Sequence, residues 1–458
     1  MAKSIEEIND KIAKKTVKVL TAEEMTRLVA ETGPEKAAAQ VDVVTTGTFG
    51  AMCSSGMWFN TGHSDPPIKM TKVWLNDVEA YTGLAAVDGY IGATQMSETR
   101  GMKYGGAHVI EDLINGKPVI LRAVAYGTDC YPRKEIVTEI TLADLNQALM
   151  FNPRNAYQRY NAAANTGAKT LYTYMGKLLP SVQNATYSGA GELSPINNDP
   201  DFRTIGIGTR IFLNGARGHI VGSGTQHNPD TGFSTLMVQG NVKEMLTEYV
   251  RAAVFKNYGC TLYVGIGVPI PVLDADIAKR TGIANRDLTV DVLDYSKPTR
   301  NRPALGKVTY EELKSGNVII DGKKVRTAPI SSYAKAKKIA GTLKQWIEKG
   351  EFLLSQTSER LSKKSVYKPM IQQEPAGFSS PRTIDITGAL KDKVSKDNRL
   401  CVECGLCIGV CSNGAYTRDP DWHIHLDSSR CVSCGQCRDI CPFDAIALKE
   451  GEVCVKNC

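Results

Sequence analysis

The residues best suited to chemistry in this chain of 458 residues are its cysteines, because eight of the thirteen lie between positions 401 and 441. They form two repeats of the spacing Cys-x-x-Cys-x-x-Cys-x-x-x-Cys: Cys401, Cys404, Cys407 and Cys411, then Cys431, Cys434, Cys437 and Cys441. The chain starts with MAKSIEEINDKIAKK, which lacks the apolar core of a signal peptide, so we expect a cytoplasmic protein. In a reducing compartment this clustering indicates metal ligation rather than disulfide bonding.

The doubled spacing is typical of bacterial ferredoxin domains that hold two [4Fe-4S] clusters. In that arrangement three close thiolates bind one cluster, and the last cysteine of each repeat ligates the other cluster. The expected ligand sets are therefore Cys401, Cys404, Cys407 and Cys441 for one cluster, and Cys431, Cys434, Cys437 and Cys411 for the second. Ser412 stands where a proline is usual, a change that removes no ligand. Zinc would not explain two complete repeats, so we predict a domain that stores or relays single electrons.

Outside this domain the most reactive candidates are three separate cysteines, Cys53, Cys130 and Cys260. Cys53 lies in the segment GAMCSSG, whose backbone amides could stabilise a thiolate. Cys130 is followed closely by Arg133 and Lys134, and nearby cations favour the thiolate that attacks or carries sulfur. The alternative for any isolated cysteine is a small buried apolar residue, and this alternative is strongest for Cys260, which starts an apolar strand.

The elements that must position these cysteines are alternating strands and helices. Short β-branched runs precede both reactive loops, at 41–46 before Cys53 and at 118–126 before Cys130, and each predicts a buried strand. Residues 142–157 are predicted to form a helix interrupted near Pro153. We expect a mixed α/β catalytic domain over 1–366, a linker over 367–398 and a small α+β ferredoxin-like domain over 399–458.

Composition excludes several classes of protein. Hydrophobic residues make up 42% of the chain, and no apolar run approaches the ~18 residues of a membrane span. The net charge of +7 fits a small anionic substrate, and nothing indicates nucleic acid binding. The dinucleotide fingerprint, the Walker loop and the serine nucleophile elbow are all missing from the sequence. Residues 323–349 carry eight basic residues against one acidic on a predicted helix, which indicates a solvated face or a docking surface.

The segments TTGTFGAMCSSG and YGTDCYPRKE, with the fused two-cluster domain, resemble the homocysteine biosynthesis family, the L-aspartate semialdehyde sulfurtransferases. The resemblance spans roughly residues 10–365. In that family two cysteines act in sulfur transfer, and the resemblance places them at Cys53 and Cys130. It implies that sulfur replaces the aldehyde oxygen of L-aspartate 4-semialdehyde to give L-homocysteine, with electrons relayed by the ferredoxin domain.

This reaction needs a small anionic aldehyde, sulfide or a persulfide donor, and an external low-potential electron donor. Cys130 is expected to carry the persulfide and Cys53 to attack its outer sulfur or to resolve the disulfide, although the two roles could be exchanged. An alternative is that Cys53, Cys130 and Cys260 ligate a third [4Fe-4S] cluster whose open iron binds hydrosulfide.

Candidate substrate-binding residues are polar groups in or near the same loops: Arg133, Lys134, His63, Arg100 and Arg210. An arginine site binds sulfonate as well as carboxylate, so the same chemistry on sulfoacetaldehyde, giving coenzyme M, is an alternative. A different class is an electron-transfer or sulfur-carrier subunit that docks on a partner enzyme through its basic face. The oligomeric state is left open, a homo-oligomer included.

Overall fold

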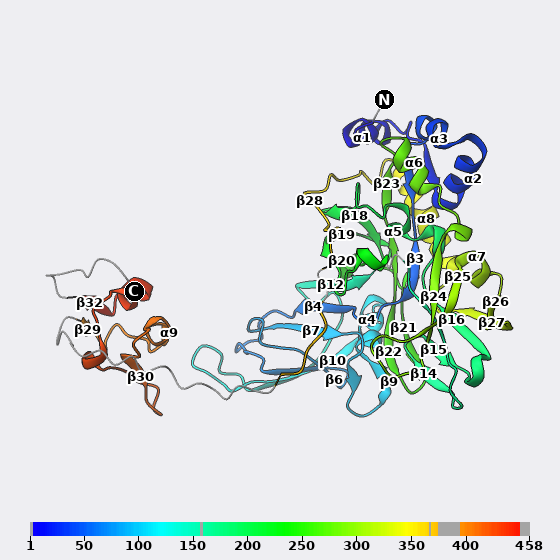
Figure 1. Cartoon of the computed structure of the whole chain (residues 1–458). Coiled ribbons are helices and arrows are strands. Elements are labelled where there is room, and N and C mark those ends of the chain that lie inside the picture. The colour runs from blue at the N-terminus through cyan, green and yellow to red at the C-terminus, as the bar shows by residue number, and fades with distance from the viewer. Residues whose placement is uncertain (1–2, 156–158, 366–367, 374–393, 449–458) are drawn as a thin grey trace. The chain divides into compact units, whose positions relative to one another are not determined.

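The computed structural model describes residues 3–155, 159–365, 368–373 and 394–448, and Figure 1 shows the whole chain. The chain divides into two compact units, Met1–Lys368 and Pro369–Cys458. Both units mix helices and strands, which confirms the predicted α/β class. In the part of the chain that the structure describes, every helix is too short or too polar to cross a bilayer.

The first unit is built on a nine-stranded sheet that carries most of the main hydrophobic core. Its strand order is β21-β22-β18-β19-β20-β12-β4-β7, and β3 pairs with β22 outside this path. The strands are β3 (Thr48–Ala51), β4 (Gly56–Asn60), β7 (Asp88–Gly92), β12 (Gln147–Asn155), β18 (Arg210–Leu213), β19 (Ala216–Ser223), β20 (Leu236–Asn241), β21 (Val250–Phe255) and β22 (Gly259–Gly267).

Strand β12 corrects the helix predicted for 142–157. Its residues alternate between exposed and buried from Gln147 to Asn152, which is the two-residue period of a strand. Pro153 lies where the pairing with β20 shifts register, between Asn152 and Asn155. Prolines are tolerated in sheets at such irregularities, because the missing N–H breaks no ladder bond there. The residue that suggested a broken helix therefore marks a β-bulge.

Two six-stranded sheets and a three-stranded sheet complete the scaffold of the first unit. The first runs β11-β10-β5-β6-β8-β9 and the second β25-β24-β13-β16-β27-β26. Their strands are β5 (Lys72–Leu75), β6 (Val78–Ala80), β8 (Met96–Ser97), β9 (Gly101–Gly105), β10 (Val119–Val124), β11 (Glu135–Ile140), β13 (Ala162–Ala164), β16 (Asn184–Tyr187), β24 (Thr289–Asp294), β25 (Ala304–Thr309), β26 (Asn317–Ile320) and β27 (Lys323–Pro329). The small sheet is β1 (Val19–Thr21), β2 (Val43–Thr45) and β23 (Pro269–Pro271), and two-stranded pairs join β14 (Leu171–Thr173) to β15 (Gly176–Leu178) and β17 (Gly206–Ile207) to β28 (Glu359–Arg360).

Helices α1, α2, α3 and α6 gather at one end of this unit (Figure 1). The α-helices among the described residues of this unit are α1 (Ile5–Ala13), α2 (Ala22–Thr32), α3 (Pro34–Gln40), α4 (Gly106–Ile114), α5 (Pro195–Asn198), α6 (Ala275–Thr281), α7 (Tyr310–Lys314) and α8 (Tyr333–Glu348). Helices α1 and α2 begin with reciprocal capping boxes, in which the side chain and the backbone N–H of Ser4 or Thr21 both pair with a glutamate three residues on. The helix predicted for 323–349 begins only at Tyr333, because the preceding residues form β27.

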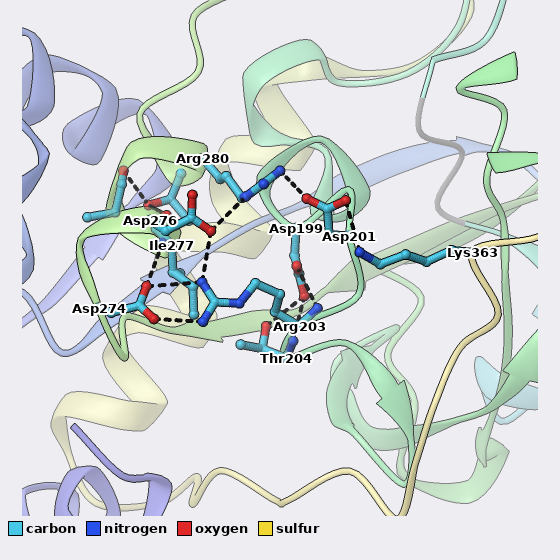
Figure 2. A network of polar contacts seen from close by, with 11 residues as sticks. Asp199, Asp201, Arg203, Thr204, Asp274, Asp276, Ile277, Arg280 and Lys363 are labelled. Carbon is cyan, nitrogen blue, oxygen red and sulfur yellow. Dashed lines mark hydrogen bonds and ion pairs between the residues drawn. The ribbon is translucent and has the colours of Figure 1, made fainter. Parts of the chain in front are cut away.

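A polar network joins the α5–β17 loop to α6, as Figure 2 shows. Arg203 donates to both carboxylate oxygens of Asp274, at 3.1 and 2.6 Å, and to Asp276 at 2.9 Å. Asp199 is 2% exposed and accepts from the backbone N–H groups of Arg203, Thr204 and Ile205. These charged side chains fix a loop in place, so we interpret this network as structural.

In residues 394–448 the second unit contains two antiparallel strand pairs and two short α-helices. Strand β29 (Val394–Lys396) pairs with β32 (Ile446–Leu448), and β30 (Tyr416–Arg418) pairs with β31 (Ile424–Leu426). The helices are α9 (Leu406–Val410) and α10 (Gln436–Ile440). Because β29 lies inside the predicted linker 367–398, the fold of this unit begins no later than Val394. Residues 374–393 of that linker lie outside the described residues.

Candidate active site and iron-sulfur sites

Cys53 lies in a tight turn between β3 and β4. The turn is closed by the N–H of Ser55, which donates to the carbonyl of Met52 at 3.0 Å. Strand β12 holds the turn from the side, because the Asn152 amide donates to the Ser55 hydroxyl at 2.7 Å. A turn pinned in this way fixes the backbone from which the half-buried Cys53 side chain projects.

The Cys53 side chain lines a cavity of about 360 Å³. Its walls come from strands β3 and β12 of the nine-stranded sheet and from turns and loops around them, among them the β14–β15 turn and the residues that directly follow β16 and β27. The lining residues are mostly aromatic and apolar, with a few polar groups: Ala51, Cys53, Arg154, Tyr160, Tyr174, Met175, Ser188, Gln226, Phe233, Tyr258 and Ile330. A cavity of this size with few polar groups is typical of a site for a small molecule.

Two hydroxyl groups contact the Cys53 sulfur. The Tyr258 hydroxyl donates to Cys53 Sγ at 3.5 Å, and Thr261 Oγ1 lies 3.4 Å from the same atom. Burial, followed by the hydrogen bond to Cys53, raises the pKa of Tyr258, so its hydroxyl keeps its proton and remains a donor. The ring of Tyr258 packs against Tyr174, with centroids 6.1 Å apart. The sulfur therefore accepts a hydrogen bond from an aromatic residue of the cavity wall and lies beside a second hydroxyl.

The cation of the cavity is Arg154, on β12. Its guanidinium hydrogen-bonds the side-chain oxygen of Gln226, which also lines the cavity. A guanidinium beside an amide can bind a carboxylate through two parallel hydrogen bonds. Arg154 is absent from the residues predicted above because it falls within the helix predicted for 142–157; the alternation along β12 was the available signal. No pattern in the sequence pointed to Tyr258 or Gln226, since both lie in turns far from Cys53 in the chain.

Cys130 lies elsewhere, at the tip of the β10–β11 hairpin, and its side chain is exposed. Thr128 and Tyr131 exchange two backbone hydrogen bonds, of 2.9 and 3.0 Å, which makes Cys130 one of the two residues of a tight turn. The hairpin packs on residues 65–68: the N–H of Arg133 donates to Pro67, and the Arg133 side chain to the carbonyl of Pro66 at 3.0 Å.

The two candidate sulfur-transfer cysteines lie toward opposite ends of β4. Cys53 precedes Gly56, the first residue of the strand, whereas residues 65–68 follow its last residue, Asn60. The pairing with the neighbouring strand β7 distinguishes the two ends of β4. Gly92, the last residue of β7, pairs with Gly56, whereas Val87, just before β7, accepts from the N–H of Thr61. A strand of five residues spans about 17 Å. The cavity of Cys53 accordingly has no lining residue from the Cys130 hairpin.

Cys260 lies on the other face of β22 from the Cys53 site. Successive side chains of a strand point to opposite faces, and its neighbour Thr261 is the residue that contacts Cys53. Cys260 itself is buried, and its thiol donates to the carbonyl of Met102 at 3.3 Å. Burial raises the pKa of the Cys260 thiol. The three thiols proposed for a third cluster are thus not brought together, and we derive no step from that alternative.

The other predicted substrate residues lie outside the Cys53 cavity. His63 stacks on Tyr131 beside the Cys130 hairpin, with centroids 5.5 Å apart, and Lys134 is exposed at the base of that hairpin. Arg100 pairs with Asp77 at 2.9 Å and stacks over the ring of Tyr104. Arg210 donates to the carbonyl of Leu353 at 3.1 Å.

The basic segment 323–349 carries several paired lysines rather than a free cationic face. On α8, Lys335 and Lys338 pair with Glu248, while Lys337 and Lys344 pair with Glu23 and Glu24. Each pair reduces the charge available to a partner. The solvated-face interpretation of this segment is therefore the better one.

In the second unit the eight clustered cysteines line two cavities. One cavity is lined by Cys401, Cys404, Cys407 and Cys441, and the other by Cys411, Cys431, Cys434 and Cys437. The walls are largely apolar, and backbone N–H groups point at sulfur: Glu403 N–H donates to Cys401 Sγ and Ser433 N–H to Cys431 Sγ, each at 3.4 Å. Four thiols around an apolar cavity, with amide donors to sulfur, fit a [4Fe-4S] cluster.

The comparisons with known proteins agree with this division of the chain. Residues 17–354 match a family described as homocysteine biosynthesis enzyme, sulfur-incorporation, and residues 400–445 match the 4Fe-4S dicluster domain. A relative from Methanosarcina acetivorans, named L-aspartate semialdehyde sulfurtransferase, is 56% identical over 81% of this chain and 74% of its own length. A relative of the same name from Methanocaldococcus jannaschii is 55% identical over 80% of this chain and 75% of its own length. These matches confirm the resemblance drawn from the cysteine loops, and the chain belongs to the sulfur-incorporating homocysteine biosynthesis enzymes.

Proposed function

We propose that this enzyme converts L-aspartate 4-semialdehyde into L-homocysteine and that the cavity around Cys53 is its active site. The observation that carries the proposal is one cavity that presents a thiol and a guanidinium together, at Cys53 and Arg154. The substrate has an aldehyde at one end and an α-carboxylate at the other, so it can address both groups at once. The names of the two methanogen relatives support the same substrate.

The atoms and electrons of the reaction balance when two electrons are supplied. Sulfide adds to the aldehyde carbon to give a thiohemiacetal, loss of water leaves a C=S bond, and two electrons with two protons reduce it to the thiol. If the sulfur arrives as the outer atom of a persulfide, two more electrons are needed to cleave the S–S bond. An external low-potential electron donor is therefore part of the proposal.

Cys53 is the residue that presents sulfur to the aldehyde, because its Sγ lies in the cavity wall. The hydroxyls of Tyr258 and Thr261 orient that sulfur. Arg154, with Gln226, binds the α-carboxylate and so places the aldehyde end toward Cys53. The tyrosine rings around the cavity limit access of water to the C=S bond.

We assign Cys130 the task of accepting sulfur from an outside donor. Its exposed position at a hairpin tip is accessible to a persulfide-bearing protein, whose outer sulfur the Cys130 thiolate accepts while the donor leaves as a thiolate. Direct transfer to Cys53 within one chain requires the hairpin to change position, whereas transfer between two copies does not. In this proposal Cys130 carries the persulfide, and Cys53 receives its outer sulfur atom.

Two [4Fe-4S] clusters are proposed in the second unit, ligated by the cysteine quartets that line its two cavities. When bound, such clusters supply single-electron transfer at low potential. The Glu403 and Ser433 amides stabilise their sulfur ligands. The chain needs no further residue to hold them.

The test is anaerobic turnover of the iron-reconstituted chain with sulfide, a low-potential reductant and L-aspartate 4-semialdehyde or sulfoacetaldehyde, with the thiol product identified by mass spectrometry. We expect homocysteine with sulfide or with a small-molecule persulfide as the donor; in the persulfide reaction it should be lost in Cys53→Ala and retained in Cys260→Ala, a matched removal of a buried thiol. Coenzyme M instead of homocysteine would keep the chemistry and replace the substrate. Turnover only after a second protein is added would indicate a carrier subunit.

A further inference from the structure

The two halves of the second unit repeat with an offset of 30 residues, which makes it simple to compare their cluster cavities. Each cysteine has a counterpart of the same burial: Cys401 and Cys431 are half-buried, and Cys407 and Cys437 are buried. The backbone conformation also repeats, because φ is +59° at Glu403 and +55° at Ser433, 30 residues later. Differences between the cavities therefore come from individual side chains.

The main difference is at the start of β30 and β32. Tyr416 lines the cavity of Cys411, Cys431, Cys434 and Cys437, and its repeat counterpart Ile446 lines the other cavity. Tyr416 is 2% exposed, and its hydroxyl donates to Cys437 Sγ at 3.6 Å. Ile446 is 5% exposed and has no donor to offer.

A second hydrogen-bond donor serves the same cysteine quartet as Tyr416. The N–H of Ala415 donates to Cys411 Sγ at 3.3 Å. Its counterpart Ala445 makes no such bond to Cys441 within the described residues 394–448. Both additional hydrogen bonds therefore point at sulfur atoms of one quartet.

Hydrogen bonds to cluster sulfur favour the reduced cluster, because reduction adds negative charge that the donors stabilise. We propose that Tyr416 raises the reduction potential of the cluster held by Cys411, Cys431, Cys434 and Cys437, so that the two clusters of this unit are electronically distinct. The inference rests on the proposed ligand sets. In this proposal Tyr416 is a positioning residue that acts through Cys437. The first electron from a low-potential donor then goes to the cluster that Tyr416 contacts.

A positive charge near the other cavity raises the reduction potential of the cluster held there. It therefore reduces the difference between the two clusters, but its effect is weaker than that of Tyr416. Lys396 lines that cavity, and its ammonium donates to the Asn398 side chain at 2.5 Å. Lys396 is only half-buried, so water partly screens its charge, whereas the Tyr416 hydroxyl is buried against sulfur. The effect of removing one hydroxyl is independent of this background charge.

The test is a redox titration of the reconstituted full chain under argon, followed by electron paramagnetic resonance of the reduced clusters. We expect Tyr416→Phe to shift one of the two midpoint potentials to a more negative value and to leave the other unchanged, at unchanged iron content. The reciprocal variant Ile446→Tyr should shift the other midpoint to a more positive value. This second variant also keeps the test decisive if Tyr416→Phe loses iron.

Midpoints that do not move in either variant, at full iron content, would overturn the proposal, as would an equal shift of both midpoints in Tyr416→Phe. The readout does not involve turnover. A failure of the proposed sulfurtransferase reaction would therefore leave this result standing, and the reverse also holds.

Discussion

The contact between Tyr258 and Cys53 leads to a sharp prediction about thiol reactivity. Replacing Tyr258 with phenylalanine removes one of the two hydroxyls on the Cys53 sulfur and leaves the ring that packs on Tyr174. Thr261 Oγ1 remains at 3.4 Å. The variant therefore weakens the stabilisation of a negatively charged sulfur without opening a hole in the cavity wall.

The magnitude follows from the geometry of the bond. A hydrogen bond to a charged group contributes about 1.5–3 kcal/mol, and a bond of 3.5 Å in a cavity open to solvent belongs at or below the low end, so we take about 1 kcal/mol. At about 1.4 kcal/mol for each factor of ten, the rate at which the Cys53 sulfur is alkylated should fall roughly fivefold. Because burial raises the pKa of Tyr258, the wild-type hydroxyl stays protonated at neutral and mildly alkaline pH, and the difference should persist there.

The assay is the rate of alkylation by iodoacetamide at neutral pH, measured for the Cys53 and Cys130 peptides of the same sample by mass spectrometry. Cys130 is exposed and far from Tyr258, so its rate is an internal reference. Tyr174→Phe is the matched control, since it removes a cavity hydroxyl that bonds Tyr295 at 2.9 Å. An unchanged Cys53 rate in Tyr258→Phe, or an equal fall at Cys130, would refute the reasoning.

Four further predictions follow from single side chains. Arg154→Gln should lower kcat/KM for the carboxylate-bearing aldehyde by roughly tenfold to a hundredfold and leave an uncharged aldehyde of equal length within about twofold, measured by thiol formation. Burial raises the pKa of Asp77, but hydrogen bonds from neighbouring hydroxyls and a guanidinium outweigh this effect and lower it to about 2. Asp77→Asn should therefore destabilise the fold by about 1 kcal/mol at neutral pH, after allowance for solvent screening, and this difference should disappear as the pH falls from about 3.9 toward 2, as followed by urea unfolding. Asp199→Ala should cost about 3 kcal/mol in the same assay, because three buried backbone N–H groups lose their acceptor, and Asp199→Asn should cost less. Cys411→Ser and Cys441→Ser should each reduce bound iron by about half, measured by iron analysis and cluster absorbance, and a variant that keeps all its iron would contradict the ligand set.

Local patterns were readable from the sequence wherever a few adjacent residues decide the outcome. The capping boxes at Ser4 and Thr21 are of this kind, because their partners lie three residues apart on one turn of helix. The dicluster domain is confirmed by its family match, since its cysteines lie on two short loops. The family resemblance drawn from the loops around Cys53 and Cys130 is confirmed for the same reason.

Patterns that depend on pairing between distant strands were not readable in this way. The helix predicted over 142–157 was wrong because a proline inside a strand at a bulge resembles a helix breaker, and the error hid Arg154. Tyr258 and Gln226 join the Cys53 cavity from turns after β21 and β19. No spacing in the chain relates either residue to Cys53.

The amino-acid sequence reveals which reactive groups this protein possesses: two quartets of cluster-ligand spacing, and two cysteines in polar loops after apolar strands. Which of these groups come together follows from the folded arrangement of the strands. Cys53 and Cys130 look equivalent along the chain, yet the turn between β3 and β4 holds Cys53 in a cavity, whereas the hairpin of β10 and β11, paired with β5 in another sheet, holds Cys130 at an exposed tip. The physical reason is that strand register is set by hydrogen bonds between residues tens to hundreds of positions apart, so the surroundings of a side chain depend on its partners across the sheet rather than on its neighbours in sequence.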